Sequence, residues 1–257
     1  MIKDRLRKVS AITLSLSIPQ GSGYTQNRMN NPWLAFNPKV DAIKVHESDL
    51  PYFMGFNKGM GNRKGKEKRQ YLLAEHIEPH PYLGNPQADV LVLMANPGVN
   101  DKEKNPKFRM NPQKLEQNRQ NLRHENLDSF TSRIHSPDNP ALESEWFKPR
   151  VRELVQATSV DRVTKGIFLV NFHAYHSRSW HPIPFTFPTQ HYTFKLVSDA
   201  VSRNALIIMS RNMLGWFTAI PNLFDHPNRI EFESTRSVYL TEGNLGKSNF
   251  KRVLERL

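Results

Sequence analysis

The amino-acid sequence predicts an α/β protein, a three-layer α/β/α sandwich with a short parallel central sheet. Three short apolar runs support this prediction, and they are residues Val90–Met94, Ile167–Val170 and Ala205–Met209. Apolar runs of this length, bounded by turn residues, are typical of strands that are buried on both faces in a parallel sheet. No linker-like stretch divides the 257 residues, so we expect one domain with a single core.

Helical patterns separate the apolar runs, as a parallel sheet with both faces covered requires. In the clearest of them, Phe147, Val151 and Leu154 recur three or four residues apart after Ser144, a residue type that caps helices. We expect helices over residues 112–122, 144–155, 189–204 and 248–257, with Ser248 as the last cap, and short strands over residues 229–233 and 237–240.

The first 85 residues are expected to form an irregular, basic extension that packs on or beside the core. Residues 20–65 are rich in Asn, Pro and Gly, and residues 58–69 mix glycine with lysine and arginine. Glycines among like charges do not pack, so this stretch is predicted to be a mobile basic loop that includes Arg63 and Lys64. The loop either binds a polyanion or is solvated without a partner, and both interpretations stay open.

The charge balance predicts an anionic partner. Lys and Arg total 36 against 24 Asp and Glu, which gives a net charge of +12. Nucleic acid is the first candidate, because each neutralised phosphate releases counterions and so favours binding. A merely soluble basic protein is the alternative. No apolar run reaches the roughly 20 residues of a membrane span, and the basic, serine-interrupted start is interpreted as an arm rather than a secretory signal.

The absence of cysteine excludes several kinds of site. With no cysteine in the chain, there can be no disulfide scaffold, thiolate-bound zinc, iron–sulfur cluster or cysteine nucleophile. This composition fits a cytoplasmic protein. The sequence also lacks a phosphate-binding glycine-rich loop, a dinucleotide fingerprint, a nucleophile elbow and a clear acidic cluster for two-metal nuclease chemistry.

The ends of the predicted strands are the places to look for chemistry, because sites in open parallel sheets lie beyond the carboxyl ends of the strands. Asn96 can hold a water or a substrate, although Asn-Pro-Gly is also a common turn. Asn171 can read a base edge or cap backbone groups. Arg211 can contact a phosphate or form a structural salt bridge. The three strand ends are Asn96-Pro97-Gly98, Asn171-Phe172-His173 and Ser210-Arg211-Asn212.

Residues 172–181 are dense in aromatic rings and histidines. Their irregular spacing and the lack of a nearby acidic ligand argue against zinc. Stacking by Tyr175 or Trp180 and hydrogen bonding by His176 and Ser177 suit a nucleic-acid ligand, whereas packing of the loop beneath the sheet end is the alternative. His76 and His80 flank Pro79, which disfavours a helical metal pair. We interpret these two histidines as structural.

These pieces, taken in order, resemble the uracil-DNA glycosylase superfamily, and most closely its mismatch-specific branch. The stretch from Ala88 to Gly98 is similar to the first motif of that family, and Ile167–Asn171 is similar to its second strand, which ends in a base-reading Asn. Phe108 lies near the position of an aromatic residue that stacks on the flipped base. Leu240–Gly246 lies where the family has its last motif, and Leu245 matches its wedge leucine. The resemblance spans about residues 85–257.

The resemblance implies a monofunctional DNA glycosylase that flips a base out of double-stranded DNA and hydrolyses its N-glycosidic bond. It implies that Asn96 positions the attacking water and that His173 or His176 supplies a donor to the leaving base. It implies no cofactor, no metal and no obligate protein partner. The residue patterns and the resemblance together give the expected site: catalytic Asn96 and His176; base-binding Pro97, Gly98, Phe108, Asn171, His173 and Tyr175; and DNA-binding Ser177, Arg211, Asn244, Leu245, Lys247, Arg63 and Lys64.

Two departures from the family pattern bear on the substrate. Met94 replaces the glycine of the first motif, and Thr241, Glu242 and Gly243 stand where the last motif has His-Pro-Ser or Asn-Pro-Ser. Both departures count against uracil as the substrate. The loop at residues 172–181 and the long extension suit a bulkier base, such as a glucosylated hydroxymethylcytosine of phage DNA in antiviral defence. The alternatives are a uracil or mismatch repair glycosylase, a non-catalytic nucleic-acid-binding protein on the same fold, and an RNA- or nucleotide-directed hydrolase.

Overall fold

The computed structural model describes residues 30–39, 42–62, 70–105, 107, 110–235 and 237–257. Every element named below belongs to one compact unit, Asn31–Leu257, which we call the second unit because residues 1–30 precede it. Within the described residues, no helix combines the length and the apolar character needed to cross a bilayer.

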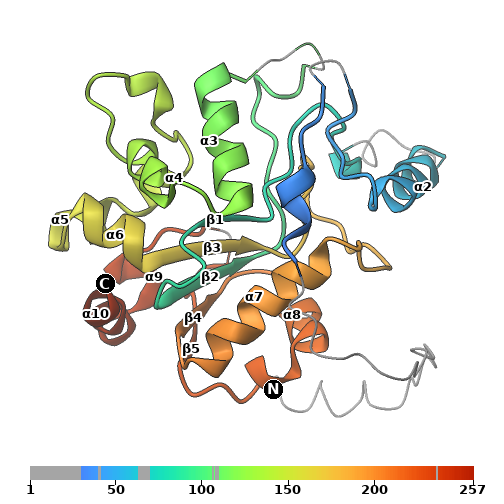
Figure 1. Cartoon of the computed structure of the whole chain (residues 1–257). Helices are drawn as coiled ribbons and strands as arrows, with labels where there is room; N and C mark the ends of the chain where they lie inside the picture. Colours follow the sequence, from blue (N-terminus) through green and yellow to red (C-terminus); the bar gives the residue numbers. More distant parts are fainter. Residues whose placement is uncertain (1–29, 40–41, 63–69, 106, 108–109, 236) are drawn as a thin grey trace, which may run out of the picture. The chain divides into compact units, whose positions relative to one another are not determined.

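A five-stranded sheet forms the centre of the second unit (Figure 1). Its order is β1-β3-β2-β4-β5, where β1 is antiparallel to β3 and the other neighbours are parallel. Every residue of β2, β3 and β4 is buried, which confirms the predicted α/β class and the three central strands. The strands are β1 (Tyr82–Gly84), β2 (Val90–Met94), β3 (Ile167–Asn171), β4 (Leu206–Met209) and β5 (Arg229–Glu231).

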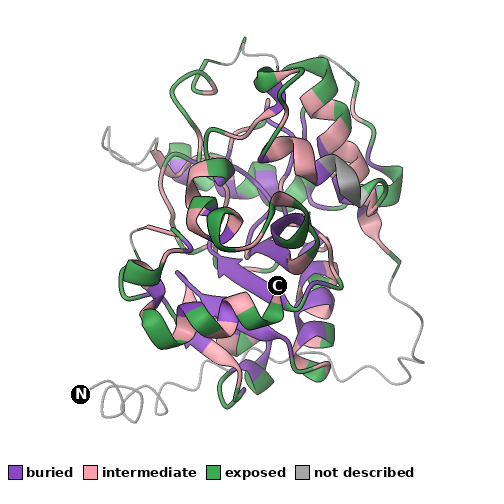
Figure 2. Cartoon of the chain, turned by 90° about the vertical axis from the view of Figure 1, so that its left-hand side faces the viewer, coloured by how far each residue is buried: buried purple, intermediate pink, exposed green. Residues whose placement is uncertain are grey.

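Two apolar clusters cover the two faces of the sheet, because side chains along a strand alternate between faces. Leu91, Leu93 and Phe168 pack on α7 (Gln190–Ser202) and α8 (Met213–Ala219). The opposite face packs on a second group of helices (Figure 1). Figure 2 shows the buried strands between helices whose outer sides are exposed. The second group is η3 (Leu127–Arg133), α4 (Phe147–Arg150), α5 (Arg152–Ala157), α6 (Val160–Gly166), α9 (Glu242–Leu245) and α10 (Lys247–Arg256).

The helices follow the predicted pattern with some differences. α3 (Pro112–Arg123) and α7 lie where they are expected. The helix expected over residues 144–155 is divided into α4 and α5 at Val151, although the Ser144 Oγ does accept a hydrogen bond from the Phe147 amide at 2.9 Å. The last helix starts at Lys247, after Gly246 at φ 76°, and not at Ser248. Residues 237–240 form no strand. Further short helices are η4 (Pro140–Leu142) and η5 (Pro221–Leu223).

The expectation of an irregular extension is wrong where the structure describes residues 31–85. This segment contains η1 (Pro32–Ala35), α2 (Leu50–Gly61) and the edge strand β1. The glycines of α2 hide its helical character, because glycine is a poor helix former, but buried aromatic side chains such as Phe53 hold the helix in place. Lys58–Gly61 therefore belong to a helix. Arg63 and Lys64 lie outside the described residues.

The sheet has a switch point at the carboxyl end of β2. From this central strand the chain continues to β3 on one side and later to β4 on the other. Loops leaving adjacent strands in opposite directions open a crevice at such a point, and this is where open α/β sheets bind their ligands. The turn at Asn96 follows β2 directly.

Candidate active site

The side-chain amide of Asn96 is held in one orientation. Its Nδ2 donates to the Ser177 Oγ at 2.8 Å and to the Pro97 carbonyl at 3.0 Å. The Ser177 hydroxyl donates in turn to the Ser179 carbonyl at 2.8 Å. Because both N–H groups have acceptors, the assignment of the amide atoms is fixed by the network. The Asn96 Oδ1 accepts no hydrogen bond from the described residues, so it can accept one from a water.

A pair of histidines supports this turn from behind. The His176 Nδ1 lies 2.7 Å from the Gly98 carbonyl oxygen; a carbonyl only accepts, so Nδ1 is protonated. The His176 Nε2 lies 2.6 Å from the His80 Nδ1. In a neutral His176 the Nε2 is an acceptor, so the His80 Nδ1 donates to it. Burial is the main cause that lowers the pKa of His176 to about 4 and the pKa of His80 well below its usual range.

These bonds correct the role expected for His176. Both of its ring nitrogens are engaged inside the protein, so it has no donor to offer to a leaving base. It positions the Gly98 backbone instead. His80, which the sequence suggested to be structural, lies at the centre of the hydrogen-bond network. Sequence reasoning missed it because its partner is 96 residues away along the chain.

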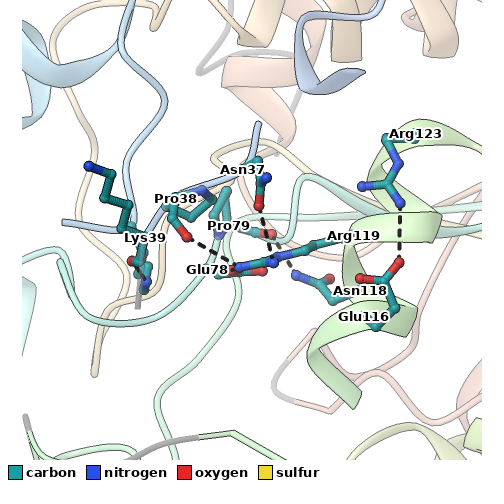
Figure 3. Close-up of polar contacts among 10 residues, drawn as sticks. Asn37, Pro38, Lys39, Glu78, Pro79, Glu116, Asn118, Arg119 and Arg123 are labelled. Carbon is teal, nitrogen blue, oxygen red and sulfur yellow. Dashed lines mark hydrogen bonds and ion pairs between the residues drawn. The ribbon is translucent and has the colours of Figure 1, made fainter. Parts of the chain in front are cut away.

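Helix α3 fixes the segment that leads to His80 (Figure 3). Arg119 extends from this helix, and its Nη2 donates to the Glu78 Oε1 at 2.7 Å. Glu78 is only 2% exposed, so this ion pair has little solvent screening. The Asn118 Nδ2 lies 3.5 Å from the Pro79 carbonyl, and Asn37 also accepts from Arg119 (Figure 3). The backbone before His80 is thereby anchored to a regular helix.

Asn171 joins the same network at the end of β3. It is the register partner of Met94, and its Nδ2 donates to the His80 carbonyl at 2.8 Å. Its Oδ1 is buried without a hydrogen-bond partner among the described residues. A continuous path of hydrogen bonds thus runs from Asn171 through His80 and His176 to the turn at Asn96. The unpaired Oδ1 can accept one N–H from a ligand.

His173 is a packed aromatic residue. Its ring stacks on Trp180 at 5.1 Å and meets the edges of Phe172 and Phe187. Burial lowers the pKa of His173 to about 3, and the side chain of Gln190 offsets part of this shift. Neither ring nitrogen has a hydrogen-bond partner of normal geometry among the described residues. A neutral ring at this position cannot supply the positive charge of an imidazolium.

Tyr175 does not fit the role of a base contact. Its hydroxyl donates to the Asp49 Oδ2 at 2.6 Å, and its ring packs between Phe53 and Phe187. This cluster anchors α2 to the loop after β3. The physical reason is that Asp49, which is fully buried, needs donors, and the tyrosine hydroxyl supplies one.

The wedge role expected for Leu245 is also wrong in this structure. Leu245 is 0% exposed and packs in the core with Leu240 and Phe250, because the segment forms the short helix α9 rather than an open loop. Asn244 braces this segment, since its Nδ2 donates to the Ser237 carbonyl at 2.8 Å and its Oδ1 accepts from the Ser234 amide at 3.0 Å.

The remaining predicted residues lie apart or are not described. Arg211 is exposed and its Nε donates to the Thr235 carbonyl at 2.9 Å. Lys247 is exposed at the start of α10. Phe108 lies outside the described residues. Within the described ranges, no three His, Asp or Glu side chains come together as metal ligands.

The structure thus brings Asn96, Gly98, Asn171, His176 and Ser177 into one network and adds His80 to it. This arrangement offers an oriented acceptor for water and a buried acceptor for a ligand N–H. Comparison of the chain with protein-family models, with curated proteins and with solved structures finds no match.

Proposed function

We propose that this protein is a monofunctional DNA glycosylase, which flips a modified base out of DNA and hydrolyses its N-glycosidic bond. The observation that supports this most is the fixed amide of Asn96 at the switch point of the sheet, with Nδ2 engaged twice and Oδ1 left as an acceptor. An amide oxygen held in one orientation can align a water for attack on C1′ of a deoxyribose. The sequence resemblance assigns this task to the same residue.

In the proposed reaction, the oxygen of water bonds to C1′ while the bond from C1′ to the base nitrogen breaks. The transition state resembles an oxocarbenium ion, as in other glycoside hydrolysis. The electron pair of the broken bond leaves with the base, and the proton of the water passes to solvent. Asn96 is too weak a base to take that proton, so the rate depends on orientation and on electrostatic stabilisation. The product is an abasic site in an intact strand.

Asn171 is the proposed base contact. Its buried Oδ1 lacks a partner among the described residues and suits an N–H on the Watson–Crick edge, such as the 4-amino group of cytosine. We favour a bulky modified cytosine of phage DNA, because the motif positions at Met94 and Thr241 depart from the uracil pattern. The net charge of +12 suits contacts to phosphates, which must also offset the few kcal/mol that base flipping costs.

A strand-scission assay tests the proposal. Purified protein is incubated with duplexes that contain uracil, a mismatched thymine or glucosylated hydroxymethylcytosine, and with matched RNA, and each sample is split and treated with or without alkali. We expect breaks only in DNA, only after alkali, and fastest with the modified cytosine. Breaks without alkali that depend on a divalent metal would show a nuclease. Equal rates for uracil would refute the substrate assignment but not the reaction.

The competing hypothesis of a non-catalytic nucleic-acid-binding protein makes a different prediction. It expects the wild-type protein to bind DNA and to leave every duplex intact after alkali. The two hypotheses also differ in the effect of Asn96→Ala, since a binding protein would keep its cellular activity without this amide. The glycosylase loses that activity while it retains affinity for DNA.

A further inference from the structure

Arg133, the last residue of η3, has a side chain without a counterion among the described residues. Its Nη2 is buried and finds no hydrogen-bond partner in that part of the chain, and its side chain forms no ion pair there. Burial lowers the pKa of Arg133 to about 10, so the guanidinium is still charged at pH 7. The residue as a whole is partly exposed, so the charge keeps some contact with water, but the buried Nη2 is an N–H donor that lacks an acceptor among the described residues.

Hydrogen bonds link the segment that carries Arg133 to the candidate active site through α3. The Ser132 Oγ, next to Arg133, accepts from the Gln117 Nε2 at 2.9 Å, and the following residue of α3, Asn118, contacts the backbone ahead of His80. The Arg133 backbone is held by the Ser144 amide, which donates to its carbonyl at 2.8 Å. The charge of Arg133 is also among the causes that lower the pKa of His80, after burial and His176.

The proposed reaction needs a donor that the two expected histidines do not supply. When the C1′–N bond breaks, the electron pair moves onto the base, and a fixed positive charge near the base lowers the barrier. Both nitrogens of His176 are bonded inside the protein, and His173 is stacked on Trp180 as a neutral ring.

We infer that Arg133 is this donor: its guanidinium contacts the flipped base and stabilises the negative charge that develops on it. The inference rests on the proposed function. In the reaction Arg133 keeps its proton and acts through its N–H groups, while the released base takes up a proton from solvent. The guanidinium then gains an anionic partner only as negative charge develops on the leaving base, so its contribution appears in the rate and not in the affinity for DNA.

The test compares Arg133→Met, Arg133→Lys and a matched control, Arg203→Met, in single-turnover excision. Arg203 donates to the Pro86 and Ala88 carbonyls at 2.7 and 3.1 Å, near the amino end of β2. We expect Arg133→Met to slow excision by roughly 10²- to 10³-fold, the usual effect of losing one such donor, with unchanged affinity for DNA. Its Tm should be equal to or above the wild-type value, because the substitution removes a buried N–H donor that has no acceptor among the described residues.

The two other variants sharpen the comparison. Arg133→Lys should recover part of the rate, and Arg203→Met should lose thermal stability while it keeps the wild-type rate. Among the bases that the wild type excises, the loss in Arg133→Met should also shrink for the base whose anion is the better leaving group, because this base needs less stabilisation. A purely structural role would leave this leaving-group dependence unchanged.

Three outcomes would overturn the inference. If the wild type excises a base and Arg133→Met does so at the same rate, Arg133 is not the donor and the proposed function stands. If Arg133→Met melts well below the wild type and loses all excision with no leaving-group dependence, the arginine is structural. If the wild type releases no base from any DNA, the proposed function is wrong, and so is the role assigned to Arg133.

Discussion

The buried histidines predict that the protein loses stability in mild acid. The folded state holds His173 and His176 neutral, with pKa values of about 3 and about 4 against 6.5 for a free imidazole. The unfolded chain binds protons at these sites below about pH 6.5, so acid favours the unfolded state. The stabilising effect of the two neutral rings is complete above pH 6.5 and is lost as the pH falls toward the folded values.

The size of this effect follows from the two shifts. At pH 5 both rings are still neutral in the folded protein. Each ring therefore lowers the free energy of unfolding by about 1.4 kcal/mol for every pH unit below 6.5. That amounts to about 2 kcal/mol for each histidine and about 4 kcal/mol for both. His80, whose pKa is also lowered by burial, acts in the same direction. Total stabilities of domains are about 5–15 kcal/mol, so the loss should be easy to measure.

Urea unfolding at pH 7 and pH 5 measures the effect. The free energy of unfolding should fall by at least about 4 kcal/mol between these values, with no change in the m-value. His176→Gln should reduce the slope by about 1.4 kcal/mol per pH unit. A free energy of unfolding that is equal at pH 7 and pH 5 would refute the neutral, hydrogen-bonded histidine pair.

Two further predictions concern residues around the site. Tyr175→Phe should lower the free energy of unfolding by about 1–3 kcal/mol, because a buried hydrogen bond to Asp49 is lost. The rate of base excision should stay unchanged. A slower single-turnover rate at equal DNA affinity would show that Tyr175 does contact the base. Gly84→Ala should destabilise the edge strand by about 1–3 kcal/mol, since Gly84 has φ +103° and a Cβ there would lie 2.5 Å from the Ile167 carbonyl oxygen. The helical Gly55, where an added Cβ would meet no atom of another part of the protein within 4 Å, is the matched control. Gly55→Ala should raise stability by about 0.5–1 kcal/mol in the same urea assay, and a loss equal to that of Gly84→Ala would contradict the steric argument.

The central strands could be predicted from the sequence because their signal is local. A strand such as β2 is apolar at every position and ends at a proline-containing turn, so its type and its carboxyl end are both visible in the sequence. The edge strand β1 could not be predicted in this way. It has only three residues, and its pairing with β3 depends on a partner that is distant along the chain.

The same distinction applies to the candidate site. Asn96 and Asn171 could be found because each lies at the carboxyl end of a buried strand. His80 could not be found, since its importance arises from contacts with His176 and Asn171 that only the fold creates. The burial of Leu245 could not be predicted either, because the resemblance suggested a loop where the chain forms a short helix that packs on the core.

The most direct test of the central claim is the number of alkali-dependent breaks that the wild type, Asn96→Ala and Asn222→Ala produce in glucosylated phage DNA. Asn222 is an exposed asparagine of η5 and serves as the matched control. If the fixed amide of Asn96 orients the attacking water, Asn96→Ala should produce breaks at least about 100-fold more slowly at unchanged DNA affinity, and Asn222→Ala should match the wild type. Equal rates for all three proteins would contradict the account.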